Sequence, residues 1–394
     1  MIISSRTRIA LTTLLFVSAH AWAAKKPVDL ARAAVAPAEA RLLDVQIAVF
    51  EHADDFFPEV RRAEARYIPV HLKQTLQAAG FWGTVRVVPD IPEMGEVDLK
   101  VSGAVRVSHG GELKLELRAI DATGKVWLDK GYKAKPDAGV YLHTESDDDP
   151  FQEIYHRIAN DLSKKYRKLK VKDVERIRSV SRLRFAANLA PDAFAGYLVV
   201  KKNRVDIARL PSRDDPMMER VSLVRDRNGM FIDTVDSYYG SLFEKMRKSY
   251  RGWRSQDYWK RVAGPSTATG SGGRNAPWGV LIAGDDWTGR TGLTGPRQGL
   301  ICGTPSLFGN GSTQEDERRW EEEQRRSHLE VLRALGESLA ADVAPLVVEV
   351  EGRVTQLTGS VEVQYAKWRS LLREIFATET GLAVSSSAKK PSRN

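Results

Sequence analysis

This chain of 394 residues has a single cysteine and no closely spaced histidines. Its single cysteine, Cys302, excludes an intrachain disulfide, so stability has to come from packing. Beyond residue 23, no two histidines lie three, four or five residues apart, which excludes the local zinc motifs. The GxSxG and HExxH signatures of hydrolases are also missing. We therefore expect no cofactor, no metal and no enzymatic activity.

The apolar run near the N-terminus is too short to span a bilayer. Residues 1–23 contain Arg6 and Arg8, an apolar stretch over 9–19 and then the small-residue pattern AWA. This arrangement is typical of a signal peptide cleaved after residue 23, whereas a membrane span needs about 20 apolar residues. The sequence therefore predicts a periplasmic protein, and residues 24–41, rich in Ala, Pro and Lys, are predicted to be a loose leader.

The charge balance gives only a weak indication of a partner. The formal net charge of +9 becomes +7 once Arg6 and Arg8 are removed with the signal peptide. The densest basic stretch, over 164–184, is interrupted by Asp173 and Glu175, which favours a solvated helix face over a site for nucleic acid or anionic headgroups. We expect envelope proteins or peptidoglycan as partners and no nucleic acid; the oligomeric state stays open.

The first half of the chain has the pattern of an α/β module over residues 42–168. The sequence LLDVQIAVF alternates like a half-buried strand, and residues 59–79 repeat apolar positions every three to four residues, as an amphipathic helix does. Short strands separated by turn residues follow over 84–134. Asp149-Pro150 then begins a second helix.

Three features of this module indicate a family. Gly103 precedes an alternating strand, Gly111 precedes LKLELRAID, and the turn DATGKVW contains Trp127. With the order strand, helix, strands, helix, the module resembles the small α/β domain at the N-terminus of the Tol translocation protein TolB and of related envelope lipoproteins. The resemblance implies a binding module of the cell envelope.

The second half is predicted to be mainly helical. Residues 169–220 are expected to be a connector. Apolar residues from Ile232 to Trp253 recur every three or four positions, and a similar seam lies within 313–343. These seams predict a long antiparallel helical hairpin over 221–343, interrupted by a glycine-rich segment, 264–312.

The C-terminal region adds a small α/β element, which makes the fold class α+β overall. Residues 344–380 are predicted to form a β-hairpin and a helix, and their sequence VVEVEGRVTQLTGSVE resembles the envelope domain called BON. Residues 381–394 are predicted to be a disordered tail. Residues 184–258 and 329–381 also resemble exported proteobacterial proteins of unassigned function.

The glycine-rich segment allows three interpretations. It has no lysine, so it does not match a phosphate-binding loop. A flexible linker is one interpretation, and superficial membrane contact through WGVLIAG, 278–284, is another. The third is a shifted reading frame, because Lys and Glu disappear abruptly between two segments rich in them.

One aromatic and basic stretch is the candidate contact site. Tyr250, Trp253 and Trp259 present rings suited to stacking on sugars or a partner, and Arg251 and Arg254 suit an anionic group. Their helical spacing favours core packing over such a contact.

The leading hypothesis is a non-enzymatic exported envelope protein that binds partner proteins or the cell wall. The first alternative is a hydrolase of cell wall or polysaccharide, with carboxylates such as Glu51, Asp54 and Asp55 assembled only in the fold. A second is peripheral membrane association through the glycine-rich tip. The acidic cluster 145–149 is interpreted as helix capping rather than as a cation site.

Overall fold

A computed structural model shows a mixed α+β protein, which confirms the fold class expected from the sequence. The described residues are 28–52, 58–90, 96–136, 138–142, 149–263, 314–340, 346–350 and 353–381. The predictions for the signal peptide, the glycine-rich segment, the C-terminal tail beyond residue 381, the candidates Asp54 and Asp55, and most of the acidic cluster lie outside these residues.

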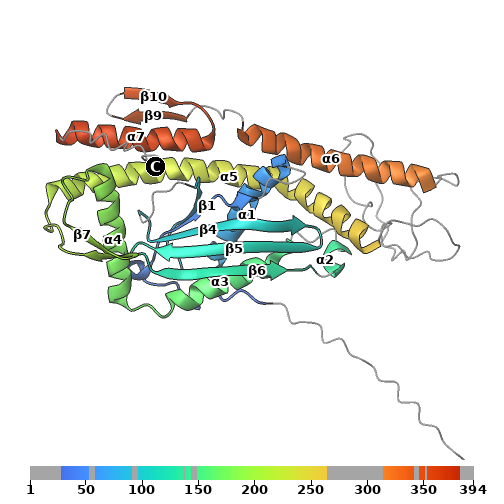
Figure 1. The fold of residues 1–394 in the computed structure, drawn as a ribbon, viewed down its shortest axis with the longest axis horizontal. Helices are drawn as coiled ribbons and strands as arrows, with labels where there is room; N and C mark the ends of the chain where they lie inside the picture. The colour runs from blue at the N-terminus through green and yellow to red at the C-terminus, as the bar shows by residue number, and fades with distance from the viewer. Residues whose placement is uncertain are drawn as a thin grey trace, which may run out of the picture.

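The largest sheet has the strand order β3-β1-β4-β5-β6, with β2 paired to β4 (Figure 1). The strands are β1 (Val45–Ala48), β2 (Glu51–His52), β3 (Val85–Val88), β4 (Leu99–His109), β5 (Glu112–Asp121) and β6 (Val126–Ala134). Strand β1 runs parallel to both β3 and β4, whereas β4, β5 and β6 form an antiparallel meander. The amino ends of β1, β3 and β4 therefore lie together at one end of the strands, which is called the sheet edge below.

Helices α1 (Pro58–Ala79) and α3 (Gln152–Tyr166) pack against this sheet, and α2 (Ala138–Leu142) follows β6. The alternation in β5 shows why: Leu113, Leu115 and Leu117 are buried in the core, while Glu116 and Arg118 between and beyond them are exposed. The sheet thus buries one face and leaves a charged face open.

Helix α1 continues through Pro69, which cannot donate a hydrogen bond to the carbonyl of Ala65. The backbone N–H of Phe50 takes that acceptor instead, at 2.9 Å. The hydrogen bond from Phe50 therefore joins α1 to the segment that follows β1, and the carbonyl of Ala65 keeps a partner despite the proline.

Residues 28–41 correct the expectation of a loose leader. The amide of Ala31 donates to Asn160 Oδ1 at 2.7 Å, His156 Nδ1 lies 2.8 Å from the Val28 carbonyl, and Ala33 N donates to Ala79 O at 2.9 Å. Side chains on α3 thus bind the backbone of this segment, a pairing that composition alone does not show.

The expected connector, 169–220, is also largely ordered into elements. It contains α4 (Val171–Leu189) and a hairpin of β7 (Leu198–Lys201) and β8 (Arg204–Ile207). Val205 N donates to Thr123 O at 2.9 Å, so the hairpin docks on the turn between β5 and β6. Gly124 permits this approach, since a Cβ there would lie 2.2 Å from Asn203 O.

Helices α5 (Pro216–Ala263) and α6 (Gln314–Ala340) form the antiparallel helical pair that the apolar seams predict (Figure 1). Two glycines allow α6 to pack closely. A Cβ on Gly252 of α5 would lie 2.6 Å from the His328 ring of α6, and a Cβ on Gly336 of α6 would lie 2.1 Å from the backbone oxygen of Glu59 in α1. Helix α6 therefore contacts α1 as well as α5.

Helix α5 also runs along β3, the outermost strand on that side of the sheet. The Asp236 carboxylate accepts a hydrogen bond from Val87 N at 2.8 Å and forms an ion pair with Lys73 of α1. One turn earlier, Asp233 pairs with Arg86 at 2.5 Å. A carboxylate on α5 thus satisfies an outward N–H of an edge strand, which would otherwise be free to pair with another chain.

The C-terminal hairpin and helix are present as predicted: β9 (Leu346–Val350), β10 (Arg353–Leu357) and α7 (Val361–Thr380). Ser360 caps the start of α7, and Gly381 ends it in the left-handed conformation at φ 67°. Trp368 of α7 stacks on Phe231 of α5 and donates to Asn228 Oδ1 at 3.2 Å. Helix α5 lies between the sheet and α7 (Figure 1).

Candidate functional site

The structure buries most of the residues expected to contact a partner. Tyr250, Trp253, Arg254 and Trp259 are each no more than 8% exposed. Arg251 is partly buried and donates to the Val140 carbonyl at 3.2 Å. This corrects the expectation of a stacking surface: the rings on α5 pack inward, and the helical seam reflects core packing.

Arg254 belongs instead to a buried polar cluster, here called the Arg254 network: Glu64, Ser108, Asp149, Tyr250 and Arg254. Its guanidinium lies 3.5 Å from the Asp149 carboxylate and donates to the Tyr250 and Ser108 hydroxyls. Tyr250 and Ser108 both donate to Glu64, at 2.5 and 2.6 Å. The guanidinium also lies over the rings of Phe151 and Tyr250.

The Arg254 network has a structural role. Every member is at most 9% exposed, so none offers a reactive group to solvent. A second cation, Arg61, pairs with Glu64 at 2.5 Å, and the charges therefore balance inside the cluster. Its residues come from α1, β4, α5 and the start of α3, which it joins together.

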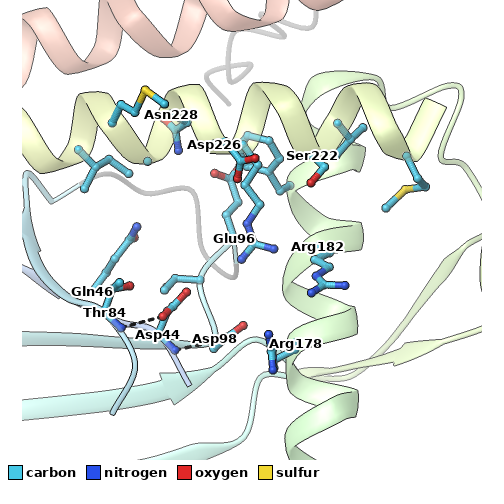
Figure 2. Close-up of a pocket in the computed structure, with 18 of the residues that line it drawn as sticks. Asp44, Gln46, Thr84, Glu96, Asp98, Arg178, Arg182, Ser222, Asp226 and Asn228 are labelled. Carbon is cyan, nitrogen blue, oxygen red and sulfur yellow. Dashed lines mark hydrogen bonds between the residues drawn. The ribbon is translucent and has the colours of Figure 1, made fainter. Parts of the chain in front are cut away.

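A cleft of about 960 Å³ lies at the other end of α5. It forms where the amino ends of β1, β3 and β4 face α4 and the first half of α5 (Figure 2). Figure 2 shows Asp44, Thr84 and Asp98 from the sheet edge on one side, Ser222, Asp226 and Asn228 from α5 on another, and Arg178 and Arg182 from α4 on a third.

Asp98 forms the floor of this cleft on the sheet side. It is only 3% exposed, and its Oδ2 accepts a hydrogen bond from Asp44 N at 3.1 Å. Asp44 in turn accepts from Thr84 N at 2.8 Å. Burial raises the pKa of the Asp98 carboxyl above its ordinary value, and the neighbouring Asp44 carboxylate adds to the rise. No hydrogen bond within the described chain reaches the other oxygen, Oδ1.

Arg225 of α5 forms the floor on the helix side. It donates to Ser181 Oγ at 3.1 Å, and Ser181 donates to the Glu96 carbonyl at 3.3 Å. The Ser181 hydroxyl and the Arg225 charge both lie close enough to Asp98 to offset part of the rise in its pKa. Burial lowers the pKa of Arg225. Within the described residues no ion pair joins Arg225 to Asp98, although both line the cleft.

The cleft carries more negative than positive charge. Among the described residues that line it, eight are Asp or Glu and five are Arg. Some of these charges are neutralised locally: Arg86 pairs with Asp233, and Glu96 pairs with Arg369 of α7. Arg182 and Asp226 are exposed at the rim. The cleft therefore combines acceptors and donors, with an acidic excess.

Of the carboxylates expected for a hydrolase, only Glu51 is among the described residues, and it does not line this cleft. It lies in a smaller hollow of about 450 Å³ on the open face of the sheet, together with Glu116 and Asp129. Within the part of the chain that the structure describes, no three His, Cys, Asp or Glu side chains are placed to hold a metal ion. No described helix is long and apolar enough to cross a membrane.

The cleft residues were missed because their sequence signals are individually ordinary. Asp44 and Asp98 each stand just before a strand, where Asp is common. Only the parallel pairing of β1 with β4 brings them together. Arg178, Arg182 and Arg225 follow the pattern of solvated helix faces, and this pattern does not show that the helices converge.

No family model matches this chain, and no curated protein matches it either.

Proposed function

We propose that this chain is a non-enzymatic, exported cell-envelope protein that binds a partner protein or the cell wall through the cleft between the sheet edge and α4 and α5. One observation supports it most directly: a cleft of about 960 Å³ whose floor places a buried, incompletely hydrogen-bonded Asp98 near a partly buried Arg225. Buried polar groups without partners are costly, and ligand sites are where such groups gather.

The helical frame supports this use of the cleft. Two of its walls, α4 and α5, are held by α7, because Arg373 of α7 donates to Asn188 of α4 at 3.1 Å and Trp368 donates to Asn228 of α5. A cleft between braced elements keeps its charged groups in place before a ligand arrives, which lowers the entropic cost of binding.

Site-specific photo-crosslinking in the native host tests this proposal. A photoreactive amino acid in place of Ser222, an exposed residue lining the cleft, is expected to give a reproducible covalent adduct in the envelope fraction. The matched control places the same amino acid at Lys245, an exposed position on α5 outside the cleft. The same adducts at both positions, or none at Ser222, would contradict a role for the cleft.

Export is a separate part of the proposal with its own measurement. N-terminal sequencing of the protein purified from the native host is expected to begin at Ala24, after removal of the 23-residue signal peptide. A product that retains Met1 and remains in the cytoplasmic fraction would contradict it.

A hydrolase is the second candidate, and one observation favours it. Asp44 and Asp98 adjoin each other in the cleft, and burial raises the pKa of Asp98, as a general acid requires. Incubation of the purified protein with cell-wall sacculi distinguishes the two candidates. Soluble fragments that appear with the wild type and not with Asp98→Asn would establish the hydrolase.

A further inference from the structure

The charge of the cleft is opposite to that of the chain as a whole. The protein has a formal net charge of +9, yet carboxylates outnumber guanidinium groups along the cleft by eight to five. A cleft lined by an excess of one sign of charge concentrates ligands of the opposite sign. The acidic excess therefore favours a cationic ligand in this cleft.

The acidic excess is concentrated on the α5 side. Asp214, Glu219 and Asp226 are exposed, and across the described residues none of them has a cation within ion-pair distance. Two of the five lining arginines are occupied, since Arg86 pairs with Asp233 and Arg178 donates to the carbonyls of residues 39 and 40, while Arg182 and Arg213 are exposed. A ligand therefore meets carboxylates at the rim that are available for ammonium or guanidinium groups.

The residues at the floor of the cleft suit an amide group rather than a cation. Asp98 Oδ1 is a buried acceptor without a hydrogen bond, and Arg225 on the opposite side is a partly buried donor with a single hydroxyl partner. An amide carries a donor and an acceptor side by side, so its N–H suits Asp98 and its carbonyl suits Arg225. Because the amide is neutral, it leaves the charges of Asp98 and Arg225 balanced.

We propose that the cleft holds a basic peptide segment of a partner protein, with one amide of that segment between Asp98 and Arg225 and its cationic side chains against Asp214, Glu219 and Asp226. This inference rests on the proposed function and names the ligand class of the same site. The cleft volume, about 960 Å³, is at the upper end of the roughly 300–1,000 Å³ of ligand pockets, which suits a peptide segment.

Binding of defined peptides to the full mature chain tests the inference. The probes are an end-blocked peptide of lysine, asparagine and glycine, the same peptide with glutamate for each lysine, and an N-acetylglucosamine oligomer, measured by calorimetry. The basic peptide is expected to bind, with an affinity at least about tenfold lower at 0.5 M than at 0.05 M salt.

Variants locate the binding. The double variant Glu219→Lys, Asp226→Lys is expected to weaken binding of the basic peptide at least about tenfold, because two attractive charges become repulsive. Asp98→Asn is expected to weaken binding of the same peptide about tenfold. The asparagine oxygen would still accept from Asp44 N, so its NH₂ group would face the N–H of the ligand, donor against donor. The control Glu244→Lys, exposed on α5 outside the cleft, should leave binding unchanged.

Tighter binding of the acidic peptide or the sugar, or equal binding by the cleft variants, overturns the inference. No binding by any probe overturns it as well. These results leave the proposed function separately testable, because a cleft-specific crosslink at Ser222 does not depend on the ligand being basic.

Discussion

Helix α5 brings a charged residue to two sites, one near each end, and the surroundings of the two differ. Arg254, near the C-terminal end, is fully buried and has a carboxylate at 3.5 Å, two hydroxyls and two aromatic faces around it. Arg225, near the N-terminal end, has one hydroxyl partner and faces the cleft. A buried charge with several partners holds elements together, whereas a charge with few partners beside solvent is available for a ligand.

Removing the best-partnered charge should have the largest effect. Arg254→Met is expected to lower the free energy of unfolding by about 3–5 kcal/mol, because Asp149 and the other acceptors lose their buried cation. Urea unfolding monitored by circular dichroism measures the change. The exposed Lys245→Met on the same helix is the control, and a loss below about 1 kcal/mol for Arg254→Met would contradict a structural role for the network.

A smaller loss is expected from a change that keeps the packing. Tyr250→Phe retains the ring but removes the hydroxyl that donates to Glu64 and accepts from Arg254. We expect a cost of about 1–3 kcal/mol, the penalty for unsatisfied buried partners. Tyr238→Phe, half-exposed on the same helix, should change stability by less than about 0.5 kcal/mol in the same unfolding experiment. Equal effects of the two variants would be the contrary result.

At the cleft, removing a charge should stabilise the protein. The raised pKa of Asp98 means that the folded chain binds more protons than the unfolded chain between the ordinary aspartate pKa, 3.8, and the folded value. Stability of the wild type therefore falls as the pH rises through this interval. Asp98→Asn is expected to unfold at a higher temperature than the wild type at pH 7, with the gap closing towards pH 4.

A gap that stays constant from pH 4 to pH 7, or an Asp98→Asn protein that melts lower at pH 7, would show that the Asp98 carboxylate is as well compensated as the Arg254 network. The two ends of α5 would then hold equally well compensated charges.

The rim should contribute least to stability. Arg182 is exposed and has no ion-pair partner within the described chain, so Arg182→Ala is expected to change the free energy of unfolding by less than about 0.5 kcal/mol. The same unfolding measurement checks this value. A loss above about 1 kcal/mol would indicate that the rim is part of the packing and not a surface kept for binding.

The apolar seam of α5 shows how much of the architecture was readable. Its period predicts a helix with one buried side, and the structure contains that helix, paired with α6. The period does not say what covers the seam. The sequence therefore left Tyr250 and Trp253 open between a partner's surface and the core, and the packing of α5 against α1 and the sheet made them core.

Local sequence also explains the elements at the C-terminus. Ser360 as cap, Gly381 as terminator and a two-residue turn between β9 and β10 are interactions within a few residues of each other. By the same reasoning, the order of residues 28–41 was missed, because Asn160 and His156 lie more than a hundred positions away.

The sequence by itself determined the mixed fold class, the long helical pair and the C-terminal hairpin with its helix, because periodicity and capping act over neighbouring residues. The tertiary structure decided which charges are buried and which line a cleft. Asp44 and Asp98 are 54 positions apart and meet only because β1 and β4 pair in parallel, and Arg225 faces them only because α5 packs across that edge. Burial and proximity, which set the energy of a charge, are properties of the assembled fold.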